Sequence, residues 1–308
     1  MNQAHQPPPW ANQLGAELPT FLELVRAYFA HRNLSIALDV SHGILRLTSV
    51  AQAQGSVIGL RNLAQLCAQA PVEQWQSLVE AHFDSLLEYL ISKEALQLGG
   101  ALAQLRTQLR ARIYSEEISN RVPDLVYRPG PEGTIEVLVL DMPTSMRTVA
   151  RSEVERWGVD VATLLDIGRQ NLRLYHAVER QPISIQPGVR VDIYASDPFY
   201  TASFVLLPEV WLAEPNMHGA LIALPRRDTL IVHNIQDLGA MDAMEAMLRA
   251  AVDLYAEGPG SISPYVYWYH DATFTKLPYT LEGNTLKLSL PESFTELIDA
   301  LEQGAVLS

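Results

Sequence analysis

Apolar, β-branched runs occur in neighbouring pairs along this chain, and amphipathic helical patterns follow many of the pairs. In the clearest pair, "ALIAL" and "TLIVH" flank Pro225, Arg226, Arg227 and Asp228. Proline and aspartate favour a tight turn, so this segment predicts a β-hairpin with a solvated, charged tip. Strands that follow one another in this way pair antiparallel. We therefore expect an α+β fold, with mostly antiparallel β-hairpins alternating with amphipathic helices, rather than a doubly wound parallel sheet.

A chain of 308 residues is long enough for two packed subdomains. The "QPPP" stretch predicts a flexible Pro-rich leader over residues 1–19. Residues 20–118 are expected to form an N-terminal α+β subdomain with long amphipathic helices, including a mostly helical segment over 98–120. Residues 119–308 are expected to form a second α+β subdomain. On the predicted helix over 98–120, Arg106 and Arg110 would share a face, and a solvated face is favoured over a basic patch.

The charge and cysteine content of the chain limit its partners and its compartment. A net charge of −13 repels phosphate backbones, so we expect no nucleic-acid partner, although a local arginine patch stays open. Cys67 is the single cysteine, it is expected to be buried in a helix, and it excludes an intrachain disulfide. No secretory signal and no bilayer-length apolar run is present, so we expect a cytoplasmic protein with no membrane partner.

Motifs that carry known chemistry are absent from the sequence. There is no HExxH or CxxC pattern for zinc, no phosphate-binding glycine loop and no GxSxG nucleophile elbow. The sequence therefore identifies no catalytic residue, predicts no metal site and implies no cofactor.

Four charged residues remain as candidate binding residues. Arg227 and Asp228 could form a presented pair that binds an anionic or polar group, or they could simply form the hairpin tip. Asp141 and Asp197, like Asp228, fall near the ends of expected strands, where carboxylates could converge or could form turns. Tyrosines alternate along "YVYWYH", where cross-strand packing is favoured over a recognition surface.

Several segments together resemble the YtpQ-like family of uncharacterised bacterial proteins, a domain of unknown function. The segments are "GLRNLAQLCAQAP" with the long helix after it, "LVLDMPTSMRTVARSEVERWGVDVATLLDIGRQNL", "YTASFVLLPEVW" and "ALIALPRRDTLIVHN". The resemblance covers most of the chain, and its Pro-x-Arg-Asp element falls on residues 225–228. It implies a bacterial cytosolic setting, gives more weight to the Arg227–Asp228 turn, and implies no catalytic residue.

Two classes of function fit these observations. The first, which we favour, is a non-enzymatic binding or protein-interaction module whose partner is another protein or a second copy of the chain. The alternative is a divalent-metal-dependent hydrolase or nuclease-like enzyme. It would use Asp141, Asp197 and Asp228 as metal ligands and Arg227 as an anion clamp, and it requires the three carboxylates to converge.

Overall fold

The computed structural model describes residues 7–48, 57–96, 102–122, 124–142, 145–174, 179–195, 199–213, 217–282 and 285–306. The chain forms two compact units. The N-terminal unit comprises Met1–Leu105, Pro143–Ser145 and Glu257–Pro259, and the C-terminal unit comprises Arg106–Met142, Met146–Ala256 and Gly260–Ser308. The segment 106–118, expected in the first subdomain, thus belongs to the C-terminal unit.

The N-terminal unit packs helices against a small antiparallel sheet. The sheet has the order β1-β2-β3 (Ile36–Asp39, Ile44–Leu47, Val57–Gly59). The helical segments are η1 (Pro9–Glu17), α1 (Leu18–His31), α2 (Arg61–Ala68), η3 (Val72–Gln74), α3 (Trp75–Leu96) and α4 (Leu102–Leu105). The expected flexible leader is wrong from Pro9 onward, because Ala11 and Leu14 of η1 are buried in the same core as Phe21 and Phe83.

The first sheet of the C-terminal unit is formed by residues 109–148. Its strands are β4 (Leu109–Ser115), β5 (Tyr127–Pro129), β6 (Thr134–Met142) and β7 (Ser145–Thr148), in the order β4-β6-β5 with β7 also on β6. Two 3-10 segments, η4 (Arg106–Gln108) and η5 (Glu116–Asn120), flank β4. Helices α5 (Arg151–Trp157) and α6 (Val161–Arg173) follow. Asp160 caps α6, since its carboxylate accepts a hydrogen bond from the Thr163 amide at 2.8 Å.

The second sheet of this unit has six antiparallel strands in the order β13-β12-β10-β11-β9-β8. They are β8 (Arg180–Gln186), β9 (Val189–Tyr194), β10 (Ala220–Arg226), β11 (Thr229–Asn234), β12 (Val266–His270) and β13 (Thr273–Leu277). The remaining elements are η6 (Thr201–Leu206), α7 (Pro208–Trp211), α8 (Gly239–Glu257), the hairpin β14 (Tyr279–Glu282) and β15 (Thr285–Leu288), and α9 (Glu292–Val306).

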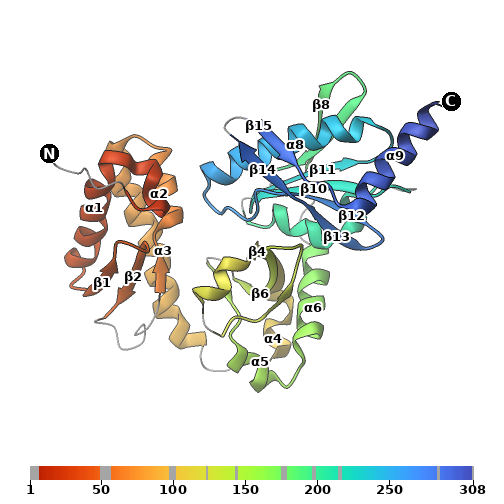
Figure 1. Ribbon diagram of the computed structural model, residues 1–308. Helices are drawn as coiled ribbons and strands as arrows, with labels where there is room; N and C mark the ends of the chain where they lie inside the picture. Colours follow the sequence, from red (N-terminus) through yellow and green to blue (C-terminus); the bar gives the residue numbers. More distant parts are fainter. Residues whose placement is uncertain are drawn as a thin grey trace. The chain divides into compact units, whose positions relative to one another are not determined.

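The two faces of the six-stranded sheet bury different cores. Helix α8 crosses one face, where Met244 and Leu248 pack with Leu221 of β10 and with Phe294 of α9 (Figure 1). On the other face, a second core combines residues of η6 and of the six-stranded sheet with β4 and β6 residues of the first sheet. The loops and strand ends around this second core therefore bring together residues from both sheets.

The expected fold class is confirmed, while two local predictions are wrong. The structure is α+β with antiparallel pairing throughout the described strands. Residues 109–115, expected to be helical, form β4, and the mostly apolar run "TASFVL", whose composition predicts a strand, forms the 3-10 segment η6. The tyrosine row of β12 does pack inward, because Tyr267 is fully buried and Tyr269 is 8% exposed. Among the described residues, no helix combines the length and the apolar character that crossing a membrane requires.

Candidate anion-binding site

The hairpin expected at residues 220–234 is confirmed, but its tip is half-buried rather than fully solvated. Strands β10 and β11 pair in antiparallel register, and the turn between them is Arg227–Asp228. Pro225 lies within β10 at a register shift, as expected for a residue that has no amide hydrogen for the ladder. The Arg227 amide donates to the Gly260 carbonyl at 2.9 Å, and the Arg227 carbonyl accepts from the Ala202 amide at 3.0 Å. The tip is thus held by the backbone on both sides.

Strand β4 presents a second set of basic residues to the same region. Its apolar residues Leu109, Ala111 and Ile113 are buried and alternate with Arg110, Arg112 and Tyr114, as the period of two in a strand requires. Residue 168 of α6 has to be glycine for close packing, because a Cβ there would lie 2.7 Å from the Ala111 amide nitrogen. The β4 side chains that alternate with the apolar row therefore extend from a closely packed strand.

Arg112 is a buried cation that has no carboxylate partner among the described residues. The residue is 6% exposed, and its Nη1 donates to the Tyr114 hydroxyl at 2.8 Å and to Met146 Sδ at 3.0 Å. Within the described parts of the chain, its buried Nε has no acceptor, and no carboxylate oxygen lies within 4.0 Å of the guanidinium. Burial of a charge without a partner of opposite sign costs several kcal/mol, so this guanidinium is a candidate group for binding an anion.

Arg227 is a second cation in this region and is partly buried. The first cause of its lowered pKa is desolvation by burial, and the second is the positive charge of Arg112. In the described chain, no carboxylate oxygen lies within 4.0 Å of its guanidinium either, although Asp228 acts on it at longer range. Its aliphatic carbons lie against Gly260, and its Cζ lies 5.8 Å from the centre of the Phe199 ring.

Aromatic rings cover these cations. The Arg112 Cζ lies 4.7 Å from the Tyr114 ring centre and 5.9 Å from the Tyr200 ring centre. Stacking of this kind covers the faces of a guanidinium and leaves its in-plane N–H groups for oxyanions. We call this set of residues the arginine cluster: Arg110, Arg112, Arg227, Tyr114, Phe199 and Tyr200.

Three of the four predicted binding residues lie in or beside the arginine cluster. Arg227 belongs to it. Asp141 lies at its edge, with Oδ2 4.0 Å from Arg110 Nε. Asp228 accepts from Arg226 Nε at 3.2 Å and from the Thr229 hydroxyl at 3.0 Å, so its carboxylate is committed to neighbours other than Arg112. Asp197 lies outside the described residues.

A fully compensated buried charge elsewhere in the same unit provides a contrast. The Glu136 carboxylate, which has no exposed surface, accepts bidentate hydrogen bonds from Arg128 at 2.6 and 3.3 Å and from Arg169 at 2.8 and 2.6 Å. Arg128 also donates to Asp166 at 3.0 Å. Every charge in this network has a partner of opposite sign, which is the usual state of buried ionic groups. Arg112 of the arginine cluster differs, because no partner of opposite charge lies within 4.0 Å of it among the described residues.

A metal centre finds no support in the described residues. No group of three or more histidine, cysteine, aspartate or glutamate residues in the described ranges could hold a metal ion. Cys67 is buried and desolvation raises its pKa to about 11, which is the opposite of what a nucleophilic thiolate requires.

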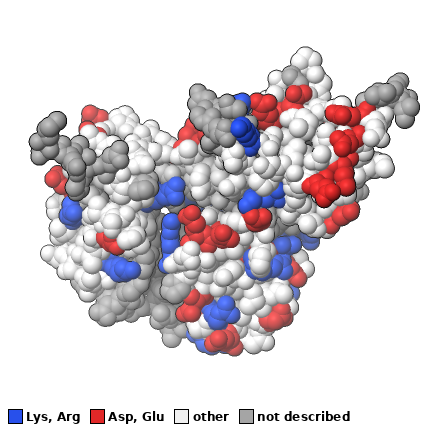
Figure 2. All heavy atoms as spheres, viewed as in Figure 1, with Lys and Arg blue, Asp and Glu red and all other residues white. Residues whose placement is uncertain are grey.

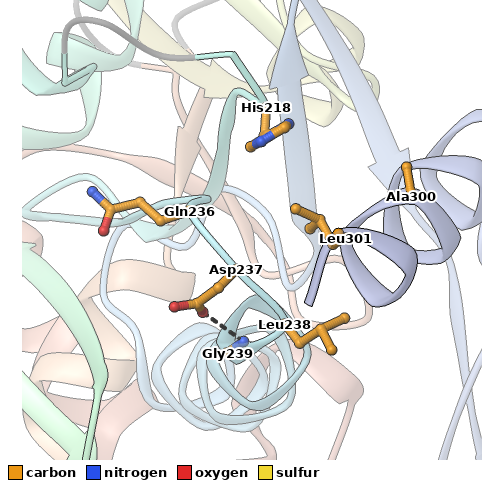
Figure 3. A pocket seen from close by; sticks show the side chains of 8 residues that line it. His218, Gln236, Asp237, Leu238, Gly239, Ala300 and Leu301 are labelled. Carbon is orange, nitrogen blue, oxygen red and sulfur yellow. Dashed lines mark hydrogen bonds between the residues drawn. The ribbon is translucent and has the colours of Figure 1, made fainter. Parts of the chain in front are cut away.

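A separate cavity of about 570 Å³ lies at the opposite end of the β10–β11 hairpin (Figure 3). It is lined by His218, by the segment 236–239 that leads into α8, and by Ala300, Leu301 and Gly304 of α9. The Leu301 side chain points into the space between these elements, whereas the Gln236 amide and the Asp237 carboxylate point away from it (Figure 3). Asp237 caps α8 instead, because its Oδ1 accepts from the Gly239 amide at 2.8 Å. No charged side chain of this lining is aimed into the cavity, so the arginine cluster is the stronger candidate site.

Arg110 and Arg112 were missed as site residues at the level of sequence, and a signal for them was available. The segment "LRARIY" alternates apolar and polar residues with period two, which indicates a half-buried strand. On the helix predicted instead, Arg110 would share a solvated face with Arg106.

Comparisons of the chain with protein-family models, with curated proteins and with solved structures found no match. The resemblance to YtpQ-like proteins therefore stays an expectation.

Proposed function

We propose that this protein is a binding protein whose arginine cluster holds an anionic group, supplied by a small molecule or by a partner protein. One observation carries the proposal: Arg112 is 6% exposed, and its guanidinium has no carboxylate oxygen within 4.0 Å among the described residues. An anion at this position would compensate both Arg112 and Arg227.

The donors available in the cluster suit an oxyanion. The in-plane N–H groups of guanidinium ions match phosphate and carboxylate oxygens in bidentate geometry, and charge-assisted hydrogen bonds are about twice as strong as neutral ones. The Tyr114 hydroxyl already accepts from Arg112, so its own hydrogen is available for a further acceptor. These groups hold and orient an anion, and no nucleophile or general base is part of the proposal.

The proposal includes the bacterial cytoplasmic setting expected from the sequence, and the single free cysteine fits a reducing compartment. It also includes self-association as one form that a protein partner could take.

The metal-dependent hydrolase would need Asp141, Asp197 and Asp228 around one cation. The ion pair of Asp228 with Arg226 and the 4.0 Å approach of Asp141 to Arg110 favour anion binding over that alternative.

The test is a calorimetric titration of the full chain with inorganic phosphate at low ionic strength. We expect saturable binding that weakens with added chloride, because the contacts are electrostatic. Arg112→Met and Arg227→Met should each weaken the affinity about tenfold or more, since a hydrogen bond to a charged group contributes about 1.5–3 kcal/mol.

The matched control is Arg249→Met. Arg249 lies on α8, its side chain is 55% exposed, and it pairs with Glu245 at 2.8 Å. This substitution removes one positive charge from the same molecule without altering the arginine cluster, so phosphate affinity should stay within about twofold. Equal losses in all three variants would show that phosphate responds to net charge alone, and the proposed site would be abandoned.

A further inference from the structure

Phe199 places an accessible aromatic surface beside the proposed anion site. Its ring centre lies 5.8 Å from the Arg227 Cζ, and the residue is 46% exposed. Tyr200, the next residue, is 1% exposed and lies on the inner side of the cluster, 5.9 Å from the Arg112 Cζ. The side chains of these two consecutive residues therefore lie in different environments. Tyr200 packs against a buried cation, and Phe199 presents a large part of its surface to solvent.

An accessible aromatic ring fits a ligand that joins an anion to a planar ring when, as here, the neighbouring guanidinium ions have no carboxylate within 4.0 Å in the described part of the chain. Nucleobases stack on aromatic side chains with little dependence on base identity, and each such stack contributes about 1–3 kcal/mol. Phosphate monoesters carry nearly two negative charges at neutral pH. Such a group therefore matches Arg112 and Arg227, which together lack a carboxylate within 4.0 Å among the described residues.

The charge of the whole molecule favours a single nucleotide over a polymer. The net charge is −13, and acidic side chains gather over α9 in Figure 2, where Glu292, Glu296, Asp299 and Glu302 are all exposed. A field of this sign repels a long polyanion. A mononucleotide can reach a local arginine site without bringing further phosphates against the acidic surface.

Building on the proposed function, we propose that the ligand of the arginine cluster is a nucleoside phosphate. Its phosphate binds the guanidinium groups of Arg112 and Arg227, and its base stacks on Phe199.

The experiment compares adenosine 5′-monophosphate with ribose 5-phosphate and inorganic phosphate by calorimetry on the full chain. We expect adenosine monophosphate to bind about tenfold or more tightly than ribose 5-phosphate, because only the former has a base. Phe199→Ala should weaken the binding of adenosine monophosphate much more than that of ribose 5-phosphate and so remove this difference, while Phe199→Trp should retain it. Phe199→Trp also shows whether a loss in Phe199→Ala reflects stacking rather than misfolding.

The outcomes separate this inference from the proposed function. If adenosine monophosphate, ribose 5-phosphate and inorganic phosphate bind equally and all depend on Arg112, the anion site stands and the nucleotide inference is overturned. If none of the three binds, both fail. An oligodeoxynucleotide that binds more tightly than the mononucleotide would identify a polymer as the ligand and would also overturn the inference.

Discussion

Arg112 lies on β4 of one sheet and Arg227 in the β10–β11 turn of the other, yet the charge of Arg112 adds to the effect of burial in lowering the pKa of Arg227. Because the two positive charges repel each other, other interactions have to hold the backbone segments that carry them. Here the closely packed strand β4 and the backbone hydrogen bonds of the β10–β11 turn do so. Like charges in partly desolvated surroundings repel one another, and the anion proposed for this site would offset that repulsion.

The first prediction concerns the stability of Arg112→Met in phosphate-free buffer. Replacing an uncompensated buried cation by an apolar side chain of similar length is neutral or stabilising, so the free energy of unfolding should stay the same or rise by about 1 kcal/mol. Phosphate at about 100 times its Kd should stabilise the unmodified protein by about 2.7 kcal/mol and the variant much less. Urea denaturation with and without phosphate measures both effects.

Arg147→Met is the matched control for that prediction. Arg147 is also largely buried, but it forms a bidentate pair with Glu153, both bonds at 2.6 Å. Removing it leaves the Glu153 carboxylate without its partner, so the same substitution should here lower the free energy of unfolding by about 3 kcal/mol. A comparable loss for Arg112→Met would show that the protein itself compensates Arg112.

The second prediction uses two glycines with nearly the same backbone conformation. Gly260 has φ +82° and Gly188 has φ +86°, so alanine is strained at both positions. A Cβ at Gly260 would lie 2.7 Å from Arg227 Cδ, whereas a Cβ at Gly188 would meet no atom within 4 Å. Gly260→Ala should therefore displace the Arg227 side chain and weaken phosphate binding, and Gly188→Ala should not. Calorimetric titration with phosphate measures the affinity of both variants. Equal affinities would show that the position of Arg227 is irrelevant to binding.

The hairpins could be predicted from sequence because their signals are local. In β10–β11 and β12–β13, period-two apolar runs flank turn-forming residues, and the partners lie within a few residues of one another. The prediction of a fully solvated tip was nevertheless wrong, because Arg227 bonds through its backbone to Gly260 and Ala202, and no local pattern places those residues there.

Strand β4 is harder to predict from sequence, because its residues favour a helix locally whereas their pairing with β6 favours a strand. Leucine, alanine, glutamine and arginine are good helix formers, and they dominate residues 101–112. Pairing with β6, in which Leu109 lies opposite Leu140 and Ser115 opposite Thr134, decides the outcome instead. Because Arg112 and Arg227 meet only through the packing of two sheets, the spacing of residues along the sequence does not indicate the arginine cluster.

The third prediction tests the compensated network around Glu136. Glu136→Gln leaves Arg128 and Arg169, whose side chains are 28% and 35% exposed, facing a neutral amide with no exposed surface, so the free energy of unfolding should fall by about 3 kcal/mol. Asp166→Asn changes a carboxylate whose side chain is 60% exposed and should cost less than about 1 kcal/mol. Chemical denaturation of both variants provides the comparison. Equal effects would mean that the burial of Glu136 adds nothing to the strength of its ion pairs.

The fourth prediction concerns Cys67, whose pKa burial raises to about 11 from 9.0. Between these values the thiol ionises in the unfolded chain but stays protonated in the folded one. Its contribution to stability is therefore fully present below pH 9 and is lost as the pH rises toward 11. We expect the stability of the unmodified protein relative to Cys67→Ala to fall between pH 8 and pH 10.5, as measured by urea denaturation. Using the difference between the two proteins cancels the ionisation of tyrosines.

Native Cys67 should also react with a thiol reagent at pH 8 far more slowly than the urea-unfolded chain, because the side chain has no exposed surface. Rapid labelling of the folded protein would instead indicate an accessible, ionised thiol and would reopen a nucleophilic role for this residue.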